Sequence, residues 1–385
     1  MSAREGQTSA RIVAHCRAGF EAEATADLSR IARAAATAID VDAPSGRGLV
    51  VATPRAFDSQ RWPRALEALP PVFVRALFFG TGPHSLFDPA RTKGRPDRVV
   101  PLVALVDTFR TGFTVPGAPH GARGHLSFGE LRLETPDTND GKEVSGLCRA
   151  IERPLAEALH EGEVLIAESD AARKRLPALH VLFVDGANVY IGASLAPWGS
   201  PWPMGIPRVR MPRGAPSRSA LKLAEALFTF LGERELDLVH AGMRAVDLGA
   251  APGGWTWQLA QRGLRVTAVD NGPLKGEVAF DPLVTHLRTD GYSYVPRKPV
   301  DWLVCDIVDS PSRIATLVAR WLSQGYARRA IFNLKLPMKK RYDEMLRCES
   351  IIREALARAH VRHTLVLRQL YHDREEISGF VERPG

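Results

Sequence analysis

A proline-rich stretch in the middle of the chain limits most strongly how this sequence can fold. Residues 197–216, PWGSPWPMGIPRVRMPRGAP, contain six prolines. Proline lacks the backbone N–H that a helix interior or a central strand needs, so this density excludes both. The stretch is predicted to be an extended linker, and it divides the 385 residues into two parts that can each bury a core.

The part before the linker is predicted to be an α+β region with antiparallel strands. Apolar runs typical of strands occur at residues 10–16, 48–52, 98–107, 126–134, 180–184 and 189–192. The last two flank Asp185-Gly-Ala-Asn188, which indicates a hairpin. Residues 21–37 and 142–161 have helical spacing, and we expect the second helix to be kinked or split near Pro154.

The part after the linker alternates between helix and strand. Helices are predicted at 217–232, 254–262, 312–324 and 342–359, and strands at 244–248, 265–269, 300–305, 330–334, 364–369 and 377–382. This alternation predicts a mainly parallel sheet of the Rossmann-like α/β class. Ligands of such sheets bind at the carboxyl ends of the strands.

A glycine-rich turn follows the first of these strands. Gly249, Gly253 and Gly254 allow a ligand to approach the backbone where a Cβ would obstruct it. The spacing G-x-x-P-G-G differs from the G-x-G-x-x-G of a pyrophosphate-binding turn, and Pro252 removes one amide donor. The turn therefore favours a nucleoside without phosphates, such as S-adenosylmethionine, over a dinucleotide.

Three aspartates stand at or near successive strand ends beside this turn. Asp270 comes 21 residues after Gly249, where a carboxylate can accept both hydroxyls of a ribose. Asp290 can accept from an adenine amino group, and Asp306 is expected nearest the methyl donor. A packing turn of some other α/β domain would not require this set of acids.

Methyl transfer to a hydroxyl requires a base, because an alcohol is too weakly acidic to lose its proton unaided. Lys222, Lys335 and the pair Glu375-Glu376 are placed where a base could work. A lysine, with a pKa of about 10.4, becomes a usable base only if a second lysine and desolvation lower that value. Methylation of a pyrimidine carbon would instead need a cysteine nucleophile, and Cys305 is expected to be a buried strand residue.

Several stretches of the second part resemble one enzyme family. They are 203–207 (PMGIP), 217–222 (SRSALK), 247–255 (DLGAAPGGW), 269–273 (VDNGP), 331–342 (IFNLKLPMKKRY) and 370–376 (LYHDREE). In this order they are similar to the bacterial family of large-subunit ribosomal RNA 2′-O-ribose methyltransferases designated M, within the wider RrmJ/FtsJ-type ribose methyltransferases. The resemblance implies S-adenosylmethionine as cofactor and a cytidine in the peptidyl-transferase region of 23S ribosomal RNA as substrate.

The resemblance also implies roles for single residues. It places the general base on Lys335 and the other members of a Lys-Asp-Lys-Glu tetrad on Lys222, Asp306 and Glu376, with Glu375 still possible for the last role. The implied cofactor contacts are Ser219, Ala251, Pro252, Gly253, Gly254, Asp270, Asp290 and Asp306. Relatives often carry cysteine at position 251, and a backbone contact would tolerate the alanine.

The resemblance is weaker before the linker, where it implies a ferredoxin-like piece and a THUMP-like RNA-binding module. We therefore expect four segments: a ferredoxin-like piece at 1–90, a THUMP-like module at 91–196, the linker at 197–216, and the Rossmann-like methyltransferase domain at 217–385.

The net charge and the composition indicate which kinds of partner the protein can bind. Residues 1–200 carry 23 basic and 23 acidic residues, so the net charge of +8 belongs to 201–385. The runs 208–222 and 339–341 would place it beside the cofactor end of the sheet, where RNA phosphates can bind. The start of the chain has no signal-peptide core, the longest apolar runs are too short to span a membrane, and the four cysteines have no CxxC spacing. We expect a cytoplasmic monomer that binds no metal and no membrane.

Two other functions remain open at this point. A base or protein methyltransferase on the same fold would not need Lys222 and Lys335 together. A catalytically silent RNA-binding or ribosome assembly factor could keep S-adenosylmethionine as a structural ligand only.

Overall fold

The computed structural model describes residues 10–118, 125–166 and 175–383. The chain forms two compact units, Met1–Ile206 and Pro207–Gly385, and the boundary between them in the sequence falls inside the proline-rich stretch. Within the described ranges, the helices are all too short or too polar to cross a membrane.

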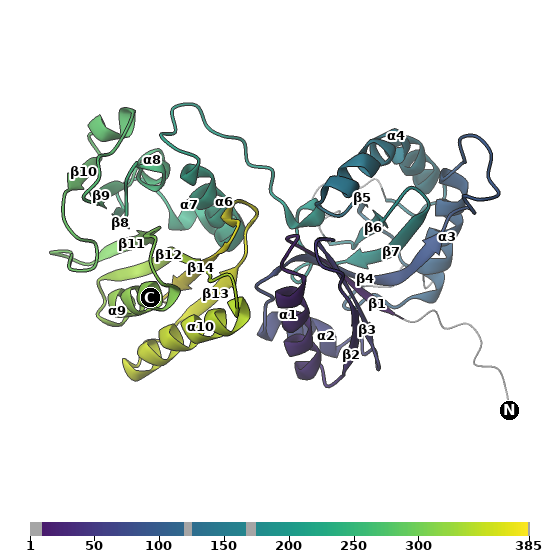
Figure 1. Ribbon diagram of the computed structural model, residues 1–385, viewed down its shortest axis with the longest axis horizontal. Helices are drawn as coiled ribbons and strands as arrows, with labels where there is room; N and C mark the ends of the chain where they lie inside the picture. The colour runs from purple at the N-terminus through teal and green to yellow at the C-terminus, as the bar shows by residue number, and fades with distance from the viewer. Residues whose placement is uncertain (1–9, 119–124, 167–174, 384–385) are drawn as a thin grey trace. The chain divides into compact units, whose positions relative to one another are not determined.

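The N-terminal unit is built on one seven-stranded sheet with the order β2-β3-β1-β4-β7-β6-β5. Its elements are β1 (Arg11–Cys16), α1 (Glu21–Ala34), β2 (Ile39–Asp42), β3 (Leu49–Pro54), α2 (Arg61–Ala68), β4 (Val74–Ser85), α3 (Val99–Gly112), β5 (Glu130–Glu134), α4 (Asn139–Glu161), β6 (Ala178–Phe183), β7 (Asn188–Ser194) and the 3-10 turn η1 (Pro203–Gly205). Helices α1 and α2 lie with β1–β3, and α3 and α4 with β5–β7 (Figure 1).

Three expectations about this unit are wrong. The strands are not all antiparallel, because β5 pairs with β6 in parallel. Residues 98–107 form the start of helix α3, not a strand, because Leu102, Val106 and Phe109 recur at helical spacing and bury one face. Pro154 does not break α4, which runs unbroken around it with the proline on the exposed side. The hairpin of β6 and β7 is confirmed, and its register pairs Phe183 with Val189.

The C-terminal unit has a second seven-stranded sheet, with the order β10-β9-β8-β11-β12-β14-β13. Its strands are β8 (Arg244–Leu248), β9 (Arg265–Val269), β10 (Val284–Leu287), β11 (Val300–Cys305), β12 (Ala327–Lys335), β13 (Thr364–Arg368) and β14 (Glu376–Glu382). Its helices are α6 (Ser219–Leu231), α7 (Glu235–Leu238), α8 (Gly254–Ala260), α9 (Pro311–Ser323) and α10 (Arg341–Arg358), with 3-10 turns η2 (Gly232–Arg234), η3 (Glu277–Phe280) and η4 (Tyr371–Asp373). Helices α6–α8 cover one face of the sheet and α9 and α10 the other (Figure 1).

This topology brings the functional segments to one edge of the sheet. Strands β10, β9, β8, β11 and β12 run parallel, and β14 runs antiparallel between β12 and β13. The predicted Rossmann-like, mainly parallel architecture is therefore confirmed. The strand order reverses between β8 and β11, so a crevice opens at their carboxyl ends. Because β14 is antiparallel, its first residue, Glu376, reaches the same edge as the last residue of β12, Lys335.

Candidate active site

The glycine turn between β8 and α8 borders a cavity of about 280 Å³. Gly249 and Gly253 have φ values of +79° and +112°, which side chains rarely adopt. A Cβ on Gly249 would lie 2.7 Å from Cγ1 of Ile307. The cavity is lined by Gly249, Ala251, Val269, Asp270, Asn271, Thr289, Asp290, Gly291, Tyr292, Asp306, Ile307 and Val308. Its volume is near the lower end of small-molecule sites, roughly 300–1,000 Å³.

Two carboxylates of the cavity are fixed by backbone donors. The Asp270 carboxylate accepts from the N–H of Ala251 at 3.0 Å and of Gly272 at 2.7 Å. The Asp290 carboxylate accepts from the N–H of Tyr292 at 3.2 Å and of Ser293 at 3.0 Å. Both side chains are therefore oriented in advance and keep lone pairs for a ligand.

The other predicted cofactor residues lie beside the cavity and not in its lining. Pro252 and Gly253 complete the turn, and Gly254 begins α8. Ser219 begins α6, and its hydroxyl lies 2.6 Å from that of Ser217. A Cβ on Gly254 would lie 2.2 Å from the Ser219 hydroxyl, so the two helix starts are in contact.

Asp247, on β8, is a buried acid that the sequence reasoning did not select. One carboxylate oxygen accepts from the Thr256 hydroxyl at 2.6 Å, and the other has no partner among the described residues. Burial raises the pKa of Asp247 to about 7. A buried acid inside an otherwise apolar strand, two residues before Gly249, is the signal that could have found it.

Lys222, from α6, lies between two carboxylates at the carboxyl edge of the sheet. Its ammonium donates to Glu376 and lies 3.7 Å from the Asp306 carboxylate. The three side chains are only 17–20% exposed. Burial alone would lower the pKa of Lys222, but the two carboxylates outweigh it and the pKa is raised. Lys222 is therefore held as a cation.

The remaining candidates for proton transfer separate clearly. Lys335 is the exposed last residue of β12 and is the register partner of Glu376. The Glu375 side chain instead accepts from Arg341 at 3.1 Å, so Glu376 is the glutamate beside Lys222. Asn333, which was not predicted, donates to Asp306 at 2.9 Å. It is a polar residue in a buried strand, two positions before Lys335 and therefore on the same face.

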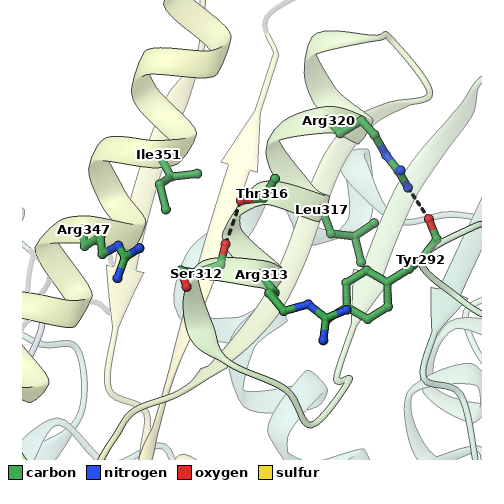
Figure 2. A pocket seen from close by; sticks show the side chains of 8 residues that line it. All are labelled: Tyr292, Ser312, Arg313, Thr316, Leu317, Arg320, Arg347 and Ile351. Atoms are coloured by element: carbon green, nitrogen blue, oxygen red, sulfur yellow. Dashed lines mark hydrogen bonds between the residues drawn. The ribbon is translucent and has the colours of Figure 1, made fainter.

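A second hollow of about 310 Å³, which we term the arginine groove, lies between α9 and α10. Its lining includes Arg313, Arg320 and Arg347 and no acidic side chain among the described residues (Figure 2). Tyr292 lines both the groove and the cofactor-sized cavity. The Arg313 guanidinium lies 4.6 Å from the centre of its ring, and Arg320 donates to its carbonyl oxygen at 2.6 Å.

Neither a thiolate nor a metal centre is found in the described residues of this unit. Cys305 is fully buried, and burial raises its thiol pKa to about 12. No group of three His, Cys, Asp or Glu that could hold a metal ion occurs in residues 10–118, 125–166 and 175–383.

The residues present fit S-adenosylmethionine. The turn leaves room that a Cβ at Gly249 would fill, and three carboxylates can accept from ribose hydroxyls and amino groups. The unpartnered oxygen of Asp247 is a further acceptor beneath the turn.

The sequence is similar to known proteins along nearly its whole length. Residues 97–195 match the family model "Ribosomal RNA large subunit methyltransferase M, N-terminal", and residues 215–355 match "FtsJ-like methyltransferase". The ribosomal RNA large subunit methyltransferase M of Azoarcus sp. is 43% identical, covering 96% of this chain and 95% of that relative. Its namesake from Thauera aminoaromatica is 44% identical, covering 97% and 96%. The ribosomal RNA large subunit methyltransferase M of Laribacter hongkongensis is 50% identical over 68% of this chain and 72% of that relative.

Proposed function

The chain belongs to the ribosomal RNA large subunit methyltransferase M family, and we propose that it methylates the ribose 2′-hydroxyl of a cytidine in 23S ribosomal RNA. The position is in the peptidyl-transferase region, as the resemblance implies. The observation that carries the ribose assignment is the grouping of Lys222, Asp306 and Glu376, with Lys335 as the register partner of Glu376, beside the cavity.

The two lysines have different tasks in this proposal. When bound, S-adenosylmethionine supplies a methyl group on a positively charged sulfur, and its transfer to oxygen leaves a neutral thioether. Lys222 is held protonated between Asp306 and Glu376, so it cannot accept a further proton. Lys335, in its neutral form, is the lysine left to accept the proton that the 2′-hydroxyl releases as its oxygen forms the new bond. Because Lys335 is exposed in the chain alone, the bound RNA would have to supply the desolvation that favours the neutral amine.

The cofactor contacts follow from the cavity. Asp270 would accept from the ribose hydroxyls and Asp290 from the adenine amino group, since both carboxylates already face the cavity. Ser219, Pro252, Gly253 and Gly254 would act by shaping the backbone around the turn. Asp306 lies in both the cavity lining and the lysine cluster, so it joins the two halves of the site.

RNA would be held by exposed cations around this edge. Arg208, Arg210, Arg213, Arg218, Lys339 and Lys340 are exposed. The arginine groove adds cations beside Tyr292 that could contact a phosphate backbone, although Arg313 is also paired with Asp309 at 2.7 Å and Arg347 lies 3.9 Å from Glu344. We further propose that residues 91–196, which carry α3, α4 and β5–β7 of the first sheet, dock the RNA as a THUMP-like module next to a ferredoxin-like piece at 1–90.

A base-directed methyltransferase is the second candidate. Methylation of a pyrimidine carbon needs a cysteine nucleophile, and the buried Cys305 has a raised pKa, which disfavours its thiolate. The paired lysines have no use in that chemistry, so the geometry supports ribose methylation better.

The test is methyl transfer from labelled S-adenosylmethionine to protein-free 23S ribosomal RNA, followed by nuclease mapping. We expect the label on a ribose, and we expect Lys335→Ala to bind the cofactor while losing transfer. Lys298→Ala, an exposed lysine just before β11, is the matched control and should leave the rate unchanged. Label on a base, or full activity of Lys335→Ala, would contradict the mechanism; no transfer to any RNA would favour the silent assembly factor.

A further inference from the structure

The two carboxylates that hold Lys222 share a second donor. The side-chain amide of Asn333 donates to Oδ1 of Asp306 at 2.9 Å and to Oε2 of Glu376 at 3.4 Å. The Lys222 ammonium contacts the same two oxygen atoms. Two donors, one cationic and one neutral, therefore bridge one pair of carboxylate oxygens.

The far side of the Asn333 amide is also engaged. Its Oδ1 lies 2.8 Å from the hydroxyl of Ser378, its register partner on β14. The same hydroxyl lies 3.1 and 3.0 Å from the two carboxyl oxygens of Asp373 in η4. Asn333, Ser378 and Asp373 are at most 3% exposed, so bulk water does not compete for these contacts.

The number of available protons determines which group donates and which accepts in each of these hydrogen bonds. Oδ1 of Asn333 can only accept, so the single hydroxyl proton of Ser378 points to it. The Ser378 oxygen must then accept from Asp373, which requires a proton on that carboxyl group. Burial raises the pKa of Asp373 to about 8, so the acid is mostly protonated at neutral pH. Its other oxygen accepts from the N–H of Leu370 at 3.0 Å, which fixes the carboxyl plane.

We propose that Asp373, Ser378 and Asn333 form a directed hydrogen-bond chain that positions Asp306 and Glu376 around Lys222. This inference rests on the proposed function of the lysine cluster, since the three residues act through it and do not touch the substrate. The chain keeps the amide hydrogens of Asn333 on the carboxylate side. A rotated amide would instead place its oxygen against two carboxylates.

The hydrogen-bond chain is needed to hold this arrangement because the Asp306 and Glu376 carboxylates repel each other. Lys222 alone is a flexible donor that would have to hold both carboxylates, whereas the amide on β12 and the hydroxyl on β14 belong to paired strands. The Asn333 amide, as a rigid second donor, keeps the Asp306 and Glu376 oxygens in contact with Lys222. Neither carboxylate is then free to form an ion pair with Lys335. Asn333, Ser378 and Asp373 are thus positioning residues.

The test compares steady-state transfer to 23S ribosomal RNA by full-length variants. Asn333→Ala and Ser378→Ala are expected to lower kcat about tenfold or more, with the KM for RNA within about threefold of the original, because hydrogen bonds to charged groups are the strong ones. Asp373→Ala should lower kcat in the same way. Asp373→Asn should restore it, since an amide donates to Ser378 and accepts from Leu370 like the protonated acid. Arg329→Gln removes a buried ion pair with Glu382 at the opposite end of the same two strands, β12 and β14, and should leave kcat unchanged.

Each outcome decides the inference. An Asp373→Asn enzyme as slow as Asp373→Ala would overturn it, because a carboxylate would then be required. Full kcat in Asn333→Ala would also overturn it, as would an equal loss in Arg329→Gln. Denaturation midpoints identify any variant that fails to fold, and the Asp373 pair keeps the comparison at one position. If the original protein transfers no methyl to ribose, the proposed function fails instead.

Discussion

Replacing Gly254 with alanine tests whether the cofactor turn and the lysine cluster depend on one close contact. The new Cβ would lie 2.2 Å from the Ser219 hydroxyl and 2.8 Å from the backbone nitrogen of Ala220. The hydroxyl can rotate away, but the backbone nitrogen cannot. Since ordinary contact begins near 3.4 Å, the start of α6 must move by about 0.6 Å. Helix α6 carries Ser219 and Lys222, so both sites would be disturbed.

The expected loss of stability follows from two opposed effects. Overpacking a well-filled site costs about 1–3 kcal/mol. Alanine in place of glycine returns at most about 0.5–1 kcal/mol, because it has less backbone entropy to lose. The net effect of Gly254→Ala is a destabilisation of about 1–2 kcal/mol, equivalent to a drop in Tm of about 2–8 °C for a unit of this size.

The assay combines urea denaturation with calorimetric titration of S-adenosylmethionine. We expect a lower denaturation midpoint and about tenfold weaker cofactor binding, since moving the start of α6 disturbs the backbone around the cofactor turn, at a cost of about one hydrogen bond. Gly146→Ala is the control: this glycine lies in α4, and a Cβ there would meet only the end of the Arg149 side chain, at 3.9 Å, so the same change should raise stability by about 0.5–1 kcal/mol. If both variants are stabilised and bind the cofactor equally well, the close approach of α6 and α8 is not needed.

Three further predictions concern charge. Burial raises the pKa of Asp247 to about 7, so between about pH 4 and pH 7 the folded protein keeps a proton that the unfolded chain releases. The free energy of unfolding therefore falls as the pH rises through this range. Asp247→Asn should make the denaturation midpoint depend less on pH in this range. The variant Arg347→Gln should lower the slope of log affinity for RNA against log salt by about 1, without changing cofactor affinity, because Arg347 lines the arginine groove and not the cofactor-sized cavity. Glu134 is fully buried, and its carboxylate lies 2.8 Å from His180. Glu134→Gln should therefore lower the free energy of unfolding by about 3 kcal/mol, which would be measured as a lower Tm with unchanged cofactor binding.

The parts of the C-terminal unit that were predicted correctly depend on local signals. The turn at 249–254 and the acids at strand ends can be identified because glycine and aspartate interrupt apolar runs of strand length. The contact of Lys222 with Glu376 could not be derived this way. The two residues are 154 positions apart, and they meet because β14 inserts antiparallel between β12 and β13. Only the family resemblance pointed to that pair.

The errors in the N-terminal unit have a different physical cause. An apolar run such as 98–107 is compatible with a buried strand and with a buried helix, and only the longer spacing through Phe109 distinguishes them. Strand β4 was missed altogether, although it lies in the middle of the first sheet. Its residues Val74–Phe79 are buried on both sides of the strand, so they show no alternation that would mark it.

Three of the site residues that escaped sequence reasoning share one property: each is a polar side chain inside a buried strand, whereas the fourth, Asp373, lies in the turn η4. Asp247, Asn333 and Ser378 all stand at positions where an apolar residue would pack without cost. Burying a polar group is unfavourable unless it is hydrogen-bonded, so such a residue needs a partner that the strand itself does not supply. In each of the three, the side-chain partner comes from another element, and two of the three lie two positions from Gly249 or Lys335. Strand alternation puts a residue two positions away on the same face. A polar residue two positions from a strand-end site residue is therefore better interpreted as part of the site's support than as an exception in the core.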